Sequence, residues 1–421
     1  MQRFPLQVLL KRVNLVSTQH LPCFVIRHFS EETQSERLAT RSYWRSEIPV
    51  PEYAQTYVRK LCKPFKHAER EEAWKEYLSL KRKREAKKDF NDWGNEPITT
   101  EVGMPPLVYD ELTSVVHTEF RIAKDFGIVT RILTDLPLQS YQPLRLLDIG
   151  CGSGSASLAA IEKYPSVNEV TLIDGSEYML KNTADLLQSS GRPFKITSYS
   201  SLPLLLQHVR VWFCCYPKAE PSYDLILMDR FLSDLPSNKA RASSCVIAWE
   251  SLKPGGTLIL AEDGDRWGFH LIRCARSLLI RMETPTELKA VFNSIEPTPD
   301  IEILAPCPHL KECPLKGNKS HWCHFAQQCA AGPTAAYKSR RKSAEVYSYL
   351  ALRKPMNGPT GVLLGSRILD TPLKRDKHVL VDVCTKTGST ERIVVTKGKM
   401  KEESEKYRAI RKGEWGGIIP E

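Results

Sequence analysis

The chain has 421 residues, of which 60 are Lys or Arg and 49 are Asp or Glu, so its formal net charge is +11. Hydrophobic residues make up 42% of the chain and charged residues 26%, which is typical of a folded protein and excludes a fibrous or disordered one. No run reaches the ~18 uncharged apolar residues that a membrane span needs, so we expect none, while the excess of positive charge favours an anionic partner such as nucleic acid.

The first 30 residues contain basic and apolar side chains but no Asp or Glu. Such an Arg-rich, acid-poor and amphipathic segment is typical of a mitochondrial transit peptide. A secretory signal would need an unbroken apolar stretch, which Lys11 and Arg12 interrupt. We therefore expect 1–30 to be a transit peptide and the protein to reside in the mitochondrial matrix; the alternative is a disordered basic tail.

Residues 31–140 predict a charged, helical N-terminal region. The segment Glu69–Lys88 consists of strong helix formers, with acids early and bases late, an order that suits the helix dipole. Six of the eight residues in Lys81–Lys88 are basic, which indicates either a solvated helix face or an arm that contacts phosphates. A second amphipathic helix is expected over Tyr109–Leu136, ending where a proline follows.

Between residues 141 and 353, short apolar runs alternate with helical stretches, which favours a parallel α/β sheet. The predicted strands are Leu144–Ile149, Val170–Ile173, Phe194–Thr197, Tyr223–Met228, Thr257–Ala261 and Glu345–Arg353. Pro254–Gly256 predicts a turn before the fifth run. The tail beyond 353 looks β-like, with alternating patterns in His378–Cys384 and Arg392–Thr396 and a hairpin turn at Thr387–Ser389 between them.

A glycine-rich segment, Leu146–Gly154 (LLDIGCGSG), follows the first predicted strand and precedes a helix. Glycines let the backbone approach a ligand closely, because no Cβ intervenes, and open α/β sheets bind ligands at the carboxyl ends of their strands. No Lys follows the glycines, as it would in a phosphate-binding loop, and an Asp precedes them, unlike in a dinucleotide site. Asp148, Gly150, Gly152 and Gly154 instead resemble motif I of class I S-adenosylmethionine-dependent methyltransferases.

This resemblance implies a Rossmann-type α/β fold and S-adenosylmethionine as a cofactor. Asp174 follows the second strand, where the acid of that family accepts the ribose hydroxyls, and Asp229 ends the fourth strand, where motif IV would lie. The catalytic signatures are missing: Arg230 and Phe231 stand where enzymes that methylate nucleobase amino groups carry Pro-Pro, and no cysteine lies in a nucleophile motif. We therefore expect a methyltransferase-like protein without recognisable catalytic residues.

The stretch 305–330 is rich in cysteine, with four residues within 23 positions: Cys307, Cys313, Cys323 and Cys329. Clustered cysteines in a large chain outside the secretory route point to metal before disulfide. The short CxxC hooks of a zinc knuckle are absent, and a Cys followed by Pro, which occurs twice here, is also found in ferredoxin-type cluster loops. Iron–sulfur and zinc both stay open, since nearby histidines would suit a mixed zinc site: His309, His321 and His324.

The pattern CPH-x3-CP followed by WCHF, together with the WGG-x-x-P ending at Trp415–Pro420, is more specific. Placed late in a methyltransferase-like core, these motifs resemble the mitochondrial small-ribosomal-subunit assembly family typified by methyltransferase-like protein 17. The likeness covers roughly residues 105–421. It implies a degenerate methyltransferase that binds rRNA of the immature mitochondrial small ribosomal subunit, as a monomer on the ribosome. The alternative is an active S-adenosylmethionine-dependent methyltransferase acting on mitochondrial rRNA or a ribosomal protein.

The same resemblance implies a [4Fe–4S] cluster and its ligands. Three come from the insert and one from the C-terminal β region: Cys307, Cys313, Cys323 and Cys384. Spacing alone would choose Cys329 as the fourth ligand, whereas the resemblance leaves Cys329 as a spare thiol on a helix. A ligand so far downstream would clamp the tail onto the core, so loss of the cluster should free the basic C-terminus. Zinc is the alternative metal.

We therefore expect four parts. A transit peptide, 1–30, precedes a helical N-terminal region, 31–140. A methyltransferase-like α/β domain follows at 141–353 and carries a metal-binding insert at 305–330. The chain ends in a basic C-terminal β region, 354–421.

Overall fold

A computed structural model describes residues 43–85, 90–93, 107–138, 140–202, 222–281, 301–334, 343–356, 365–376, 378–398 and 404–419. The predicted transit peptide and part of the basic run Lys81–Lys88 lie outside these ranges. None of the described helices is long and apolar enough to cross a membrane.

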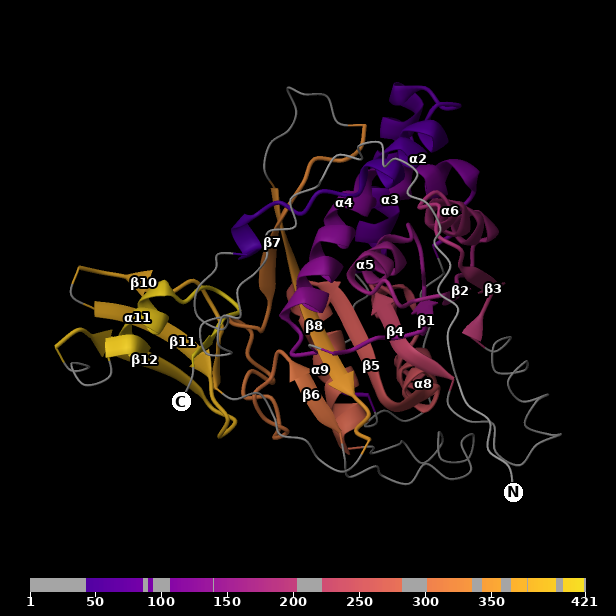
Figure 1. Cartoon of the computed structure of the whole chain (residues 1–421). Helices are drawn as coiled ribbons and strands as arrows, with labels where there is room; N and C mark the ends of the chain where they lie inside the picture. The colour runs from indigo at the N-terminus through magenta and orange to yellow at the C-terminus, as the bar shows by residue number, and fades with distance from the viewer. Residues whose placement is uncertain are drawn as a thin grey trace, which may run out of the picture.

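The centre of the molecule is an eight-stranded sheet in the order β3-β2-β1-β4-β5-β8-β6, with β7 also paired to β8 (Figure 1). The strands are β1 (Arg145–Ile149), β2 (Glu169–Ile173), β3 (Lys195–Tyr199), β4 (Tyr223–Asp229), β5 (Leu252–Asp263), β6 (Glu302–Ala305), β7 (Phe325–Cys329) and β8 (Ser343–Arg353). β1 to β5 are parallel, whereas β8 is antiparallel to β5, β6 and β7. The order 3-2-1-4-5 is that of a doubly wound sheet, and the predicted methyltransferase-like α/β fold is confirmed.

Helices cover both faces of the sheet. One face packs against α2 (Glu52–Cys62), α4 (Glu111–Asp135), α5 (Ser155–Lys163) and α6 (Glu177–Gln188), and the other against α8 (Asn238–Glu250) and α9 (Arg266–Arg281). Successive residues of β1 serve the two cores, because strand side chains alternate: Leu146 lies in the first and Leu147 in the second. Two 3₁₀ turns, η1 (Tyr43–Arg45) and η2 (Leu232–Asp234), complete this unit.

The charged helix α3 (His67–Glu85) packs on α4 through a buried ion pair. Arg70 Nε lies 2.7 Å from Glu119 Oε2, and both side chains are almost fully buried. Removing one partner of such a pair leaves an uncompensated charge and typically costs about 3–5 kcal/mol. The predicted helix over Tyr109–Leu136 is confirmed by α4, which begins where the Asp110 carboxylate accepts a hydrogen bond from Thr113 N at 2.8 Å.

Two local predictions differ from the structure. Pro254–Gly256 lies within β5 instead of preceding it, because Tyr223 pairs with Leu252 and Leu225 with Thr257, which leaves the Pro-Gly-Gly residues as a bulge. Cys329 ends the strand β7 and does not lie on a helix. The local sequence FAQQC has little strand preference, but the edge of β8 supplies the backbone partners that decide its conformation.

The C-terminal region forms a second, five-stranded sheet beside the edge of the first (Figure 1). Its strands are β9 (Ser366–Ile368), β10 (Leu373–Lys374), β11 (His378–Cys384), β12 (Thr390–Thr396) and β13 (Ile418–Ile419). β11 and β12 and the turn between them were predicted, whereas the helix α11 (Ser404–Lys412) was not. α11 forms because Tyr407 and Ile410, three residues apart, pack on the apolar core of this sheet.

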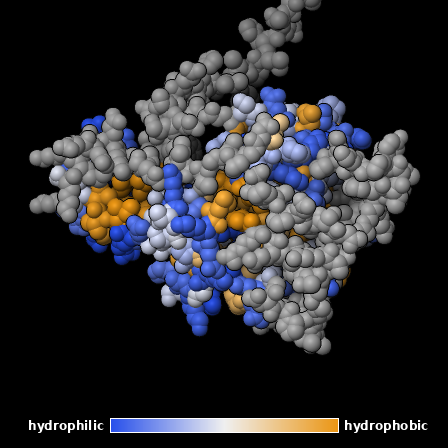
Figure 2. All heavy atoms as spheres, turned by 90° about the horizontal axis from the view of Figure 1, so that it is seen from below, coloured by the Kyte–Doolittle hydropathy of each residue, from blue (hydrophilic) through white to orange (hydrophobic). Residues whose placement is uncertain are grey.

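The outer face of the C-terminal sheet carries an apolar patch next to the exposed Asp382–Arg392 ion pair. Leu373 and Val394, 49% and 55% exposed, are both cross-strand neighbours of Leu380. Seen from below, hydrophobic residues gather at the left of the surface, where this region lies (Figure 2). The two faces of the small sheet thus differ, since α11 covers only the inner one.

Candidate cofactor cavity and metal centre

A cavity of about 750 Å³ opens at the carboxyl ends of the parallel strands. Four of the predicted cofactor residues line it: Gly150, Gly152, Asp174 and Asp229. The other two, Asp148 and Gly154, are not among its lining residues. The volume lies within the range of small-molecule sites, which runs from about 300 to about 1,000 Å³.

The backbone of the glycine loop explains its composition. Gly150, Gly152 and Gly154 have φ angles of +74°, +47° and +75°, in the left-handed region that favours glycine. A Cβ on Gly150 would lie 2.5 Å from the ring of Phe231. A Cβ on Gly152 would meet no atom nearer than 3.8 Å, because this residue borders the cavity.

Asp148 stabilises the glycine loop through hydrogen bonds to α5. Its side chain is fully buried, and Oδ2 accepts hydrogen bonds from the amide and the hydroxyl of Ser157 at 3.1 and 2.5 Å. Burial raises the pKa of Asp148 to about 6. The carboxyl group therefore ties the loop to the first turn of α5.

Asp174 presents its carboxylate to the cavity. One oxygen accepts Gly152 N and the other accepts Ser176 N, each at 2.9 Å. Each oxygen has a further lone pair, so the group can still accept hydroxyl donors from a ligand. Burial raises the pKa of Asp174.

The wall beyond β4 is charged and internally paired. Arg230, with a φ of +55°, lies 2.8 Å from Asp125 and also pairs with Asp263. Burial opposes ionisation of Asp125, but Arg121 and Arg230 overcome it and hold its pKa below the usual range. Burial, reinforced by Asp125, raises the pKa of Asp229 well above its ordinary value. Arg230 is thus held in a structural ion-pair network.

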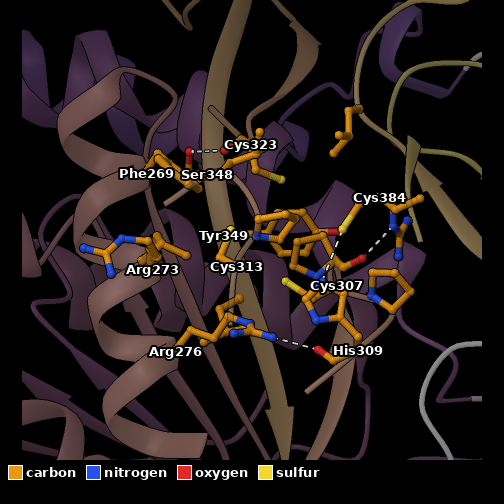
Figure 3. Close-up of a pocket in the computed structure, with 18 residues that line it drawn as sticks. Phe269, Arg273, Arg276, Cys307, His309, Cys313, Cys323, Ser348, Tyr349 and Cys384 are labelled. Atoms are coloured by element: carbon orange, nitrogen blue, oxygen red, sulfur yellow. Dashed lines mark hydrogen bonds between the residues drawn. The ribbon is translucent and has the colours of Figure 1, made fainter. Parts of the chain in front are cut away.

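The four predicted metal ligands line a second, smaller cavity of about 40 Å³ (Figure 3). Three come from the loop 306–324, and Cys384 is the last residue of β11. Cys329 lies elsewhere, with its Sγ 3.3 and 3.8 Å from the carbonyl oxygens of Gln327 and Lys124. The structure therefore brings together the four cysteines implied by the resemblance and not the four that are nearest in sequence.

Strand pairing positions the loop. β6 and β7 pair with opposite ends of the same edge of β8, so the chain between them leaves and re-enters the sheet at one edge. The C-terminal sheet meets this loop through Cys384, whose register partner on β9 is Arg367. Trp415, in the WGG segment, donates its Nε1 hydrogen to His324 O at 2.9 Å and packs edge-on against Trp44. Three distant parts of the chain thus meet at the cysteine cavity.

Three arginines also line the cysteine cavity, and sequence reasoning missed all of them. Arg273 pairs with Asp92. Arg276 donates to the carbonyl oxygens of His309 and Lys311 at 2.7 and 2.8 Å, and Arg367 donates to those of Pro306 and Gly416 at 2.9 and 2.6 Å. The only local signal was the basic pair three residues apart on the otherwise apolar face of α9.

The donor set fits a metal that binds thiolates. Burial raises the pKa of Cys313 to about 11 and that of Cys384 to about 12, with Cys307 the next contributor to each. These thiols are protonated near neutral pH unless a metal replaces their protons. His309 Nε2 lies 3.4 Å from Cys384 Sγ, where it can donate to a thiolate.

The spacing of the sulfurs separates two kinds of metal site. Among the described residues, a single group has three donor atoms within 4.8 Å of one another: Asp92, His270 and Cys274. No three of the four cavity sulfurs therefore lie within 4.8 Å of one another, whereas a tetrahedral zinc with ~2.3 Å bonds requires all four about 3.8 Å apart. The Asp92 group is itself a poor cation site, because the Arg273 guanidinium contacts all three of its members.

The chain is similar in sequence to a known protein family and to several of its relatives. The family described as "Mitochondrial small ribosomal subunit Rsm22" matches residues 111–420. The chain is 29% identical over 329 residues to Rsm22-cox11 tandem protein 2, mitochondrial, of Schizosaccharomyces pombe, covering 69% of this chain and 40% of that protein. It is 28% identical over 320 residues to the human Ribosome assembly protein METTL17, mitochondrial, covering 75% and 64%. The chain thus spans less than two thirds of either relative.

Solved structures give weaker matches. The N-methyltransferase NodS from Bradyrhizobium japonicum WM9, in complex with S-adenosyl-l-homocysteine, matches with a TM-score of 0.29 and 15% identity, over 54% of this chain and 85% of its own. A methyltransferase from Methanosarcina mazei matches with a TM-score of 0.27 and 20% identity, over 51% and 94%. The fold rests on the strand order described above and not on these scores.

Proposed function

The chain belongs to the mitochondrial small ribosomal subunit Rsm22 family, and from this premise we propose that it is a mitochondrial ribosome assembly protein. It acts in the matrix as a monomer bound to the small subunit and its rRNA. It carries a [4Fe–4S] cluster, binds S-adenosylmethionine and transfers no methyl group. The human and Saccharomyces cerevisiae relatives, both named as mitochondrial ribosome assembly proteins, support this role.

The observation that carries the cluster proposal is the convergence of four cysteines from two sheets on one cavity. Cys307, Cys313, Cys323 and Cys384 would hold the iron, and Cys329 would not. The wide spacing of their sulfurs favours a polynuclear cluster over a single zinc ion. When bound, the cluster supplies cross-links between the insert and the C-terminal sheet.

The cofactor cavity supports binding of S-adenosylmethionine without transfer. Its glycine loop and Asp174 would bind the nucleoside and amino-acid parts of the cofactor. The residues after β4 support an inactive protein, because Arg230 is engaged with Asp125 and Asp263 and no Pro-Pro holds an amino acceptor.

The C-terminal region offers a basic surface for rRNA. Tyr407 and Ile410 face the core, so the cations of α11 are exposed: Arg408, Arg411 and Lys412. Arg411 donates to Arg375 O at 3.3 Å, which places Arg375 and its neighbour Lys374, both exposed, beside α11. Clustered Lys and Arg bind phosphates and release counterions.

The proposal is tested by anaerobic purification with iron, sulfide and zinc quantified. We expect iron and sulfide in the wild-type protein, their loss in Cys307→Ser together with loss of association with the small subunit, and their retention in the matched control Cys329→Ser. A zinc-only protein, or a Cys307→Ser protein that still associates, would contradict it.

The second candidate, an active methyltransferase, is favoured by the size of the cavity and the exposed lone pairs of Asp174. Gly152→Arg fills this cavity, since Gly152 borders it. We expect mitochondrial translation to be maintained by this variant. A methyl mark on rRNA or a ribosomal protein that disappears with it would favour the enzyme instead.

A further inference from the structure

Within the described part of the chain, two of the three arginines around the cysteine cavity lack an acidic partner. Arg276 and Arg367 are each only 4% exposed. Neither has a carboxylate within ion-pair distance among the described residues, and both donate hydrogen bonds to backbone carbonyls. Arg273, which is 6% exposed, differs because Asp92 balances its charge.

Carbonyl oxygens satisfy hydrogen-bond donors but do not neutralise a charge. A buried charge without a counter-ion is costly, and native proteins pair such groups. Both guanidinium groups face the same sulfurs, since Arg276 and Arg367 line the cavity that the four cysteines also line. The anion that these two cations face is therefore the set of cysteine sulfurs.

The charges also match in number. Four thiolates around a [4Fe–4S] core with two positive charges leave two negative charges on the site. Two guanidinium groups balance that charge, whereas four protonated thiols would leave both cations unbalanced.

We infer that Arg276 and Arg367 are the counter-charges of a dianionic, thiolate-bound metal site, and that Arg367 transmits its loading to the C-terminal sheet. This inference rests on the proposed metal centre and deepens it. Arg276 belongs to α9 of the main domain. Arg367 belongs to β9 of the C-terminal sheet. Metal loss therefore leaves its charge unbalanced at the junction between the main domain and the C-terminal sheet.

The contacts of Arg367 explain why the junction would open. Its Nε donates to Pro306 O, next to a ligand of the insert, and one terminal nitrogen donates to Gly416 O in the WGG tail. Its register partner is Cys384. One side chain thus joins the insert, the strand of the fourth ligand and the C-terminus, and access of water at this point relieves the unbalanced charge.

The test compares metal-loaded and chelated full-length protein by hydrogen exchange over residues 366–384 and 415–419. In the wild type, we expect metal removal to raise exchange at both segments. In Arg367→Gln, which removes the charge and keeps one polar donor group, we expect this difference to be roughly threefold smaller, because the apo protein no longer buries an unpaired cation. Arg367→Lys should restore it.

The loaded protein gives a second readout. The reduced cluster is more negative than the oxidised cluster, so a nearby positive charge stabilises it. We therefore expect a lower reduction potential in Arg367→Gln and in Arg276→Gln, each of which removes such a charge. Arg392→Gln is the matched control, because Arg392 is exposed on the same region and pairs with Asp382. It should match the wild type in both measurements.

The outcomes separate the inference from the proposed function. An Arg367→Gln protein with the wild-type exchange difference and potential overturns the inference while the cluster stands. Zinc in place of iron in the wild-type protein would overturn the proposed [4Fe–4S] cluster. The difference in exchange between loaded and chelated protein would still test the role of Arg367. Should Arg367→Gln fail to fold, Arg276→Gln tests the counter-charge role by the same exchange difference between loaded and chelated protein. An exchange difference equal to that of the wild type would overturn the inference.

Discussion

The two cavities of this protein are held together in different ways. The cofactor cavity is bounded by the carboxyl ends of neighbouring parallel strands, and its loop is shaped by glycine φ angles and by Asp148 within one sheet. The cysteine cavity joins two sheets, and its walls combine cysteine side chains with buried arginines. The first cavity is therefore shaped by the backbone of one sheet, whereas the second, under the inference above, would need a bound ligand to balance the charge of its arginines.

The largest effect is expected from a variant that disrupts the cysteine cavity and leaves the cofactor cavity intact. Cys384→Ser removes the ligand on β11, so we expect loss of iron and increased proteolysis of the C-terminal region, because the link between the sheets is lost. Binding of S-adenosylmethionine, measured by calorimetry, should be unchanged. Cys329→Ser, with its thiol buried against backbone carbonyls, is the control that should keep iron.

The converse variant is Gly150→Ala. Its Cβ would approach the ring of Phe231 within 2.5 Å at a left-handed φ, which we expect to cost about 1–3 kcal/mol and to displace the loop. Calorimetry should show loss of S-adenosylmethionine binding, while iron content stays at the wild-type level. Gly175→Ala serves as the stability control, since its Cβ would meet no atom within 4 Å; iron loss in Gly150→Ala would contradict the independence of the two cavities.

A smaller effect is expected from the basic surface of the C-terminal region. Replacing Arg408, Arg411 and Lys412 by Ala should weaken binding to small-subunit rRNA and lower the slope of log affinity against log salt by about 0.7–0.9 for each lost phosphate contact. Filter binding at several salt concentrations measures both. A variant with three exposed lysines replaced elsewhere on the main domain, at Lys181, Lys195 and Lys239, should bind like the wild type.

The smallest effect concerns the proton of the buried Asp148, which supports the glycine loop. Because burial raises the pKa of Asp148 from 3.8 to about 6, the folded state binds a proton more tightly than the unfolded state. Stability from this group is therefore present below pH ~4 and is lost as pH rises towards ~6, by at most about 3 kcal/mol. Asp148→Asn should flatten the dependence of the free energy of unfolding on pH in this window, measured by urea denaturation. An unchanged slope between those pH values would show that Asp148 does not titrate there.

Local patterns predicted most of the central sheet. In the described chain, helices follow the first, second, fourth and fifth of the five parallel strands, and each apolar run satisfies its own periodicity, so the existence of these strands could be predicted without tertiary information. The strand at Cys329 and the helix α11 were not, because the edge of β8 and the core of the small sheet decided their conformations. The bulge at Pro254–Gly256 likewise depends on pairing with β4.

The residues of the two candidate sites also differ in whether local sequence could predict them. Asp148 and the glycines after it could be named from spacing, since a loop between a strand and a helix is a local structure. Spacing favoured Cys329 beside the three insert cysteines, and only the family resemblance named Cys384. Nothing in the order of residues pointed to Arg276 and Arg367 as neighbours.

By itself, the sequence determined the type of fold, the position of the cofactor loop and the presence of a thiol-rich insert, because these depend on periodicity, glycine conformation and residue chemistry over short distances. The tertiary structure decided which sulfur completes the cysteine cavity and which cations surround it. Those choices depend on two sheets meeting at one edge, where burial makes an unbalanced charge costly.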